Sequence, residues 1–322
     1  MESESTSQIY SLGYRKWEKK FKGTIYRVLT IALVEAKTAL GSRIVKLLIF
    51  ARVAILVIGI FKLITFGISG ITFMLSFDAL FGLMMSPTFL PIFAGKTAFL
   101  KVFAAMLGSQ FSFFDVLLIG WVGSSLISND REYNSITLYL SRPIRKTEYV
   151  IGKYGAVFIY VLSFTWVPTT LYFFTLEILM ERSFSQIAFD IVSVYFPALF
   201  SGLINGLLIM TLVLSLSSIT KRGLYVGMLT AAINPLSILF SQIMRNVLGV
   251  DFWYLFSLPI CLKIIQLFLI GVSPSEYFAS TQETAINLSP ISAGICFLFI
   301  GVLILIFLYI LIRQIRKLEL TE

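Results

Sequence analysis

The chain has 322 residues, but it contains no histidine and only two cysteines. The absence of histidine excludes acid/base catalysis and metal sites that depend on imidazole, and it argues against an intramembrane hydrolase. Cys261 and Cys296 lie far apart, each within an apolar run, so neither a disulfide framework nor a cysteine metal cluster is predicted. The residue types therefore give no reason to expect an enzyme.

Charged residues are also scarce, at 13% of the chain against 57% hydrophobic residues, and the mean hydropathy is +0.89. Soluble domains usually carry about 25% charged residues. Apolar runs long enough for membrane-spanning helices occur several times, whereas the alternating segments of a membrane barrel do not. The predicted fold class is an all-α integral membrane protein.

Two sequence signals are missing. Residues 1–22 lack the apolar centre of a signal peptide, so we expect the N-terminus to stay in the cytoplasm. No segment matches the G-x-x-x-x-G-K-[ST] pattern of a P-loop, so no nucleotide or other cofactor is expected on this chain. The net charge of +9 is attributed to membrane topology and does not call for a nucleic-acid partner.

The chain is interpreted as one transmembrane domain. Residues 1–43 form a cytoplasmic tail with an amphipathic helix, 44–243 hold five spans, 244–290 form an outer hairpin, and 291–322 hold the sixth span and a cytoplasmic tail. The six spans are predicted from 44 into the 60s and at 102–127, 150–180, 191–216, 223–243 and 291–312. We expect a kink at Pro168 and an interruption at Asn234-Pro235.

The amphipathic helix is predicted over Thr24–Leu40, with Ile25, Leu29, Ala32, Leu33, Ala36 and Leu40 on one apolar face. Such a helix would lie in the plane of the membrane surface. In the first span, Arg52 and Lys62 are expected to extend towards opposite membrane surfaces. Gly202 and Gly206 permit close helix contact, either within the chain or between two copies.

The distribution of basic residues supports this topology. Cytoplasmic segments of the predicted arrangement hold 19 of the 26 Lys and Arg residues, as the positive-inside rule requires, with both termini in the cytoplasm. A further span at 252–272 would place the Arg313 cluster outside. We therefore predict that this stretch re-enters the membrane or lies on its outer surface.

Asp115 is the one acidic residue well inside the second predicted span. An intramembrane carboxylate suggests a substrate or ion pathway. It can equally be structural, either protonated or hydrogen-bonded to Ser112 or a neighbouring helix. The sequence leaves both interpretations open.

The most polar interruption of the apolar central region runs from Ser124 to Lys153. Asn129 and Asp130 are typical N-cap residues, and Glu132 follows Asn129 at the spacing of a capping box. Pro143 ends a helix, and a second helix can begin near Thr147. We predict a bent surface helix from Asp130 to Leu140.

This segment resembles the one between the second and third spans of ABC-2 type permeases of ATP-binding cassette transporters. The matching positions are Glu132, Thr137, Leu138, Leu140, Ser141, Pro143, Ile144, Glu148, Gly152 and Lys153. Tyr139 replaces an aliphatic residue of the family pattern, and Arg145-Lys146 shifts its basic position. The resemblance covers about thirty residues and extends to the helix at 24–40, which is similar to the family's elbow helix.

The resemblance implies a six-helix permease with a cytoplasmic coupling helix, working as a homodimer or with a close paralogue in the lipid of the cell membrane. A separate ATPase subunit, which binds MgATP, would dock on the surface helix. The expected contact residues are Asp130, Arg131, Glu132, Tyr139, Arg142, Pro143, Arg145 and Glu148. The expected activity is ATP-driven export, with few polar residues in the spans favouring a lipid-like or amphipathic substrate.

Two other classes remain open. An ion-coupled secondary transporter would need several mid-membrane carboxylates or inverted repeats, whereas only Asp115 is well placed and no repeat is evident. A membrane scaffold or assembly protein would need no transport pathway at all.

Overall fold

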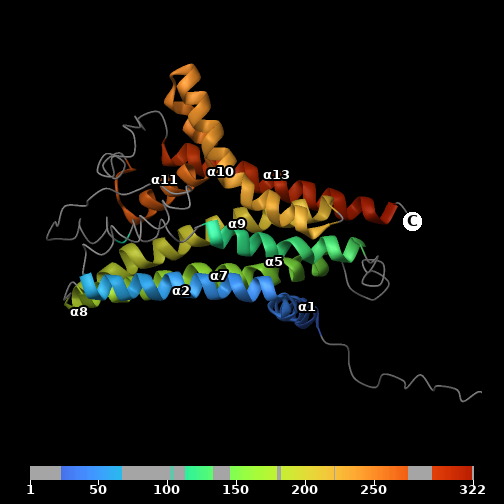
Figure 1. The fold of residues 1–322 in the computed structure, drawn as a ribbon, viewed down its shortest axis with the longest axis horizontal. Helices are drawn as coiled ribbons and strands as arrows, with labels where there is room; N and C mark the ends of the chain where they lie inside the picture. Colours follow the sequence, from blue (N-terminus) through green and yellow to red (C-terminus); the bar gives the residue numbers. More distant parts are fainter. Residues whose placement is uncertain are drawn as a thin grey trace, which may run out of the picture.

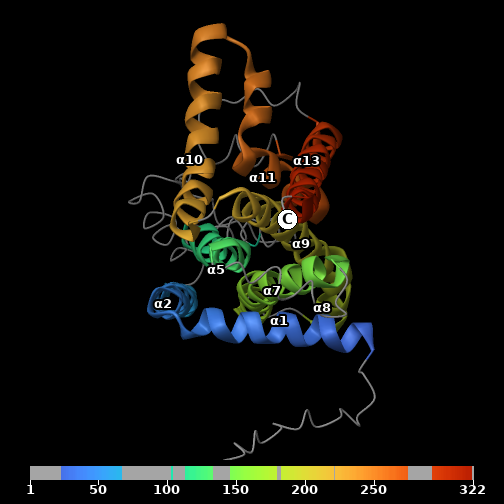
Figure 2. The same ribbon diagram turned by 90° about the vertical axis from the view of Figure 1, so that its right-hand side faces the viewer.

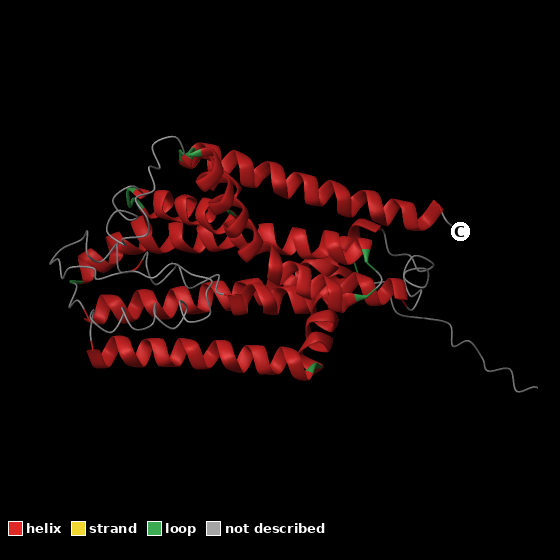
Figure 3. Cartoon of the chain, turned by 45° about the horizontal axis from the view of Figure 1, so that its top comes forward, coloured by secondary structure: helices red, strands yellow, loops and turns green. Residues whose placement is uncertain are grey.

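The described residues fold entirely into helices and short connections, with no strand among them (Figures 1 and 3). The computed structural model describes residues 23–66, 103, 113–132, 146–179, 183–220, 222–274 and 292–320. The longer helices are α1 (Thr24–Gly41), α2 (Arg43–Phe66), α5 (Phe113–Glu132), α7 (Lys146–Leu179), α9 (Phe196–Ile219), α10 (Gly223–Leu248) and α13 (Ala293–Leu320). The shorter elements are α8 (Phe184–Asp190), the π-helical turn η3 (Ile191–Tyr195), the 3₁₀ helix η4 (Asp251–Phe256) and α11 (Leu258–Ile270).

Five helical stretches of the described chain are long and apolar enough to cross a membrane, as expected for a multi-pass membrane protein. They are Arg43–Phe61, Thr147–Leu179, Phe184–Ile219, Gly223–Leu248 and Ala293–Gln314. The predicted span at 102–127 corresponds to α5 and residues before it, of which 104–112 lie outside the described residues. Because α5 carries Asp115 and a polar end, it is not among the five.

The long helices run side by side, with α9 in the interior and α1 lying across one end (Figures 1 and 2). Helix α9 contacts α5, α7, α11 and α13, and most of its residues are buried. Its Gly206 lies so close to Val161 of α7 that a Cβ atom at this position would overlap with the valine side chain. Gly206 therefore serves packing within one chain.

Two predictions about the fourth and fifth spans were wrong. The fourth span begins earlier than residue 191, because α8 and η3 continue without a break into α9, whose first turn accommodates a proline. Helix α10 also continues through Asn234-Pro235. A proline removes one hydrogen bond but can bend a helix without ending it, and the C-terminal half of α10 turns away from α5 in Figure 1 and packs against η4.

The stretch after α10 forms a short buried helix. Gly249 and Gly271 take left-handed conformations with φ of 68° and 82°, and they end α10 and α11. Helix α11 has 13 residues, or about 20 Å, which is too short to cross a bilayer. It is buried against α9, α10 and α13. The described part of 252–272 thus holds no helix long enough to cross a bilayer, and its position relative to the membrane stays a prediction; residues 275–291 of the predicted hairpin lie outside the described part.

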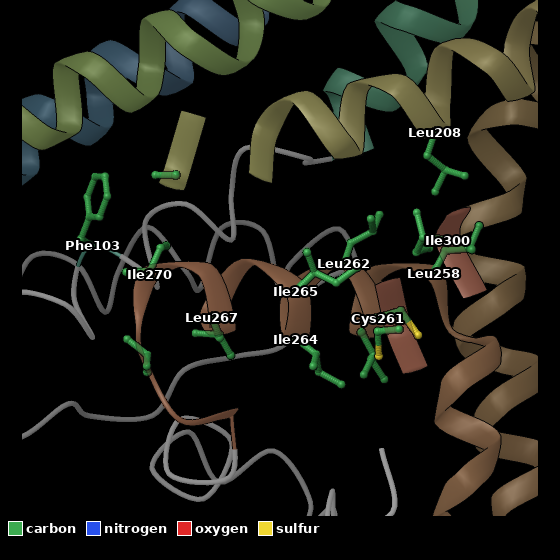
Figure 4. Close-up of a cluster of buried hydrophobic side chains, with 14 of the residues drawn as sticks. Phe103, Leu208, Leu258, Cys261, Leu262, Ile264, Ile265, Leu267, Ile270 and Ile300 are labelled. Atoms are coloured by element: carbon green, nitrogen blue, oxygen red, sulfur yellow. The ribbon is translucent and has the colours of Figure 1, made fainter. Parts of the chain in front are cut away.

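The two cysteines, far apart in sequence, belong to the same core cluster between α11 and α13 (Figure 4). Both are free thiols, and the Cys261 thiol donates to the carbonyl oxygen of Leu255 at 2.9 Å. The neighbouring Cys296 thiol, together with burial, raises the pKa of Cys261. Cys261 therefore stays protonated and acts as a small apolar side chain in the core.

Candidate functional site

Charged side chains from three helices meet where α1 crosses the ends of α5 and α7. The Lys153 Nζ atom lies 2.5 Å from Glu35 Oε1 on α1 and 2.8 Å from Asp130 Oδ2 on α5. Only 1% of the Lys153 side chain is exposed, so its amino group is enclosed between two carboxylates. We call this group, with its neighbours Arg27, Glu148 and Tyr149, the Lys153 cluster.

The neighbours extend the cluster along α7. The Tyr149 hydroxyl donates to Asp130 Oδ2 at 2.7 Å, and its ring lies beneath the Lys153 ammonium at 5.4 Å. One turn earlier, Arg27 of α1 pairs with the buried Glu148 carboxylate at 3.2 Å. The start of α7 is thus bound to α1 by two ion pairs and to α5 by an ion pair and a hydrogen bond.

Small residues on α7 allow α1 to approach closely enough for these pairs to form. A Cβ atom on Gly152 would lie 2.7 Å from Ile31 Cγ2, and one on Gly155 would lie 2.9 Å from Ala32 Cβ. Further along, the Tyr160 hydroxyl donates to the Ala36 carbonyl oxygen at 2.7 Å. Gly152 and Lys153, adjacent in the family-like motif, therefore act together: the glycine makes room for α1, and the lysine binds it.

The predicted apolar face of α1 is divided by this packing. Ala32 and Ala36 are buried, whereas Ile25, Leu29 and Leu33 are more than half exposed. The side facing α7 also carries Arg27, Ile31 and Glu35 at intervals of four residues, one helical face. This face was not predicted from the sequence, because the prediction rested on apolar residues and Arg27 and Glu35 are charged.

The predicted helix start at Asn129 and Asp130 was wrong. Helix α5 continues through Glu132, so both residues lie inside its last turn. The Asp130 carboxylate is bound by Tyr149 and Lys153. The last turns of α5 are also fixed to α9, because the Ser217 hydroxyl accepts from the backbone nitrogen of Ser128 at 3.1 Å and donates to the Ser124 carbonyl oxygen at 2.8 Å.

The structure brings some predicted contact residues together and leaves others undescribed. Asp130 is partly buried in the cluster, Glu132 is exposed at the end of α5, and Glu148 is 3% exposed. Since Glu148 binds Arg27, a contact of its side chain with an ATPase stays a prediction that this arrangement does not favour. Tyr139, Arg142, Pro143 and Arg145, the bent helix beyond Glu132 and the Arg131 side chain lie outside the described residues.

Asp115 belongs to a second polar site, between α2 and α5. Its Oδ1 atom lies 2.8 Å from Arg52 Nε, and the two side chains are 1% and 3% exposed. The expectation that Arg52 extends to the membrane surface is corrected: a buried carboxylate within reach neutralises the guanidinium inside the bundle. The pairing agrees with a structural role for Asp115 and leaves a pathway role untested.

Other potential sites are few in the described chain. No group of three or more acidic or cysteine side chains is placed there to hold a metal ion. No protein-family model matches the chain, and no curated protein matches it. The Lys153 cluster is the candidate functional site because of its position between three helices and its buried charges.

The glycine at the crossing of α1 and α7 gives a direct test of this packing. Gly152→Ala is expected to lower the free energy of unfolding by about 1 to 3 kcal/mol, because Ile31 is held too close for a Cβ atom. Gly301→Ala, in α13 with nothing within 4 Å, is the matched control and should be neutral or stabilising by up to about 1 kcal/mol. Thermal unfolding of the purified variants measures both, and equal effects would contradict the close crossing.

Proposed function

We propose that the chain is the permease subunit of an ATP-driven exporter of the ABC-2 type. ATP hydrolysis is assigned to a separate cytoplasmic subunit that carries MgATP. The observation that supports this most is the Lys153 cluster, which binds α1 to the two helices on either side of residues 133–145. These residues are the segment whose sequence resembles an ATPase-docking helix.

Movement of that segment would pass to the membrane-spanning helices through the Lys153 cluster. A force on residues 133–145 reaches Asp130 at one end and the start of α7 at the other. Both ends share the Lys153 ammonium, and the same ammonium binds Glu35 of α1. We infer that α1, α5 and α7 move together when an ATPase dimer closes, with α1 as the elbow helix and the coupling helix within residues 133–145.

In this proposal, α1 and the C-terminal end of α13 lie on the cytoplasmic side of the bundle. The membrane is the cell membrane. The permease pairs with a second copy or a close paralogue. A lipid-like or amphipathic substrate suits the high mean hydropathy of the spans.

The proposed function is tested first by purifying the tagged chain from its native membrane in mild detergent. We expect a nucleotide-binding subunit to co-purify in equal amount and to hydrolyse ATP. Recovery of the chain alone, without any ATPase activity, would contradict the proposal and favour a scaffold or an ion-coupled transporter.

Within such a complex, Glu132→Ala and Pro143→Ala are expected to lower substrate-stimulated ATPase activity several-fold while membrane insertion is unchanged. Glu132 is exposed at the end of α5, so its loss removes a charge available to the partner and no ion pair within the described part of the chain. Ser185→Ala, an exposed change in α8, is the control. Full stimulated activity in both test variants would show that this segment does not couple to the ATPase.

A further inference from the structure

The corner between α1 and α2 concentrates exposed positive charge. Among the described side chains, five Lys or Arg residues are exposed, namely Lys37, Arg43, Lys46, Arg222 and Arg313. Three of the five lie within ten residues of one another, on either side of the bend at Ser42. No acidic residue occurs from 36 to 51, and none of the three cations forms an ion pair within the described part of the chain.

The fold keeps this charge from being neutralised. Glu35, two residues before Lys37, is the one nearby carboxylate on α1. Its Oε1 atom lies 2.5 Å from Lys153, and its side chain is only 18% exposed. Within the described part of the chain, no carboxylate therefore offsets the three cations of the corner.

Exposed apolar side chains continue from the cations on the same helix faces. Arg43, Lys46, Leu47 and Phe50 have the i, i+3, i+4, i+7 spacing of one face of α2. Leu47 and Phe50 are 66% and 73% exposed. On α1, Lys37 shares a face with the exposed Leu33 and Leu40. On α2 the cations come first along the helix and the exposed apolar residues follow. This order matches the phosphate group and the acyl chain of a phospholipid.

We propose that the α1–α2 corner binds an anionic phospholipid, with Lys37, Arg43 and Lys46 around the headgroup phosphate and Leu47 and Phe50 against an acyl chain. Charge complementarity selects this occupant. A second copy of the chain, docked here by two-fold symmetry, would bring the same three cations against themselves. The proposal requires that α2 crosses a bilayer and does not depend on the proposed export function.

The test compares two double variants that each remove two exposed cations from the same end of the bundle. Purified chain in mild detergent is titrated with phosphatidylglycerol or phosphatidylcholine of identical acyl chains, and bound lipid is counted by native mass spectrometry. Arg43→Gln/Lys46→Gln should reduce the preference for phosphatidylglycerol by about tenfold or more, from roughly fivefold per cation. Arg222→Gln/Arg313→Gln should keep the wild-type preference.

Two controls separate a specific lipid site from other effects of the substitutions. Arg43→Lys/Lys46→Arg should keep the preference, because the charges are kept, and thermal unfolding without added lipid should be the same in all variants. Equal loss in both double variants would mean a diffuse surface charge without a site and would overturn the proposal. An unchanged lipid preference with an altered oligomeric state in Arg43→Gln/Lys46→Gln would overturn it too, in favour of a contact between copies.

Discussion

Replacing Lys153 by methionine is expected to lower the free energy of unfolding by about 3 to 5 kcal/mol. The lysine is 1% exposed, and its ammonium lies between the carboxylates of Glu35 and Asp130. Methionine fills a similar volume but leaves two carboxylates without their shared cation at a site that water hardly reaches. Such a buried charge costs far more than a surface ion pair contributes. Thermal or denaturant unfolding of the purified chain measures the loss.

The control for Lys153→Met removes the charges that the substitution leaves behind. In the triple variant Glu35→Gln/Asp130→Asn/Lys153→Met, the amides keep the shape of the acids without their charge. We expect it to recover at least half of the lost stability, because neutral groups are less costly to bury than unpaired carboxylates. If Lys153→Met is as stable as the wild type, or if the triple variant is less stable than the single one, the buried ion-pair account is wrong.

The same set of variants separates stability from coupling. The triple variant restores packing between α1 and α7 but has no ionic bridge from Asp130 to Glu35. If this bridge transmits movement from residues 133–145, the triple variant should fold and recruit the ATPase while its substrate-stimulated ATPase activity stays low. Full stimulation would mean that the packing at Gly152 and Gly155, together with the remaining Arg27–Glu148 pair, carries the movement.

The parts of the fold that the sequence predicted well are those that depend on local hydropathy. A bilayer requires long apolar helices whatever their neighbours, so the stretches in α2, α7, α9, α10 and α13 could be recognised from single windows. Helix α1 was predicted with nearly the observed ends, from its periodicity. The position of α1 against α7 was not predicted. The role of Gly152 and Gly155 depends on which helix packs against them, and the local sequence does not show this.

The candidate site could be predicted only in part, because its bonds join distant residues. Glu35 and Lys153 are 118 positions apart, and Arg27 and Glu148 are 121 apart. Local spacing instead suggested that Asp130 caps a new helix, which is how an isolated Asn-Asp pair would behave. In the fold a tyrosine and a lysine bind that carboxylate, and the helix continues. Tertiary charge pairing overrode the local capping preference.

The buried pair of Arg52 and Asp115 is the second site where a large effect is expected. Asp115→Asn should lower the free energy of unfolding by about 3 to 5 kcal/mol, because it leaves the Arg52 guanidinium, 3% exposed, without its carboxylate. Arg52→Gln should lower the free energy of unfolding by a similar amount, because it leaves the buried Asp115 carboxylate without its guanidinium. Unfolding of both variants in detergent checks this, and a loss below about 1 kcal/mol in each would contradict a buried ion pair.

Removing both charges distinguishes a structural pair from a transport pathway. In Arg52→Met/Asp115→Leu no buried charge is left, and we expect stability to return to within about 1 kcal/mol of the wild type. Under the exporter proposal this variant should still move substrate when ATP is supplied and ion gradients are collapsed. An ion-coupled transporter would instead lose transport in the double variant despite its restored stability, because a carboxylate that carries the ion cannot be replaced by leucine. A stable, transport-inactive double variant would therefore move the assignment of Asp115 from a structural partner of Arg52 to the ion pathway.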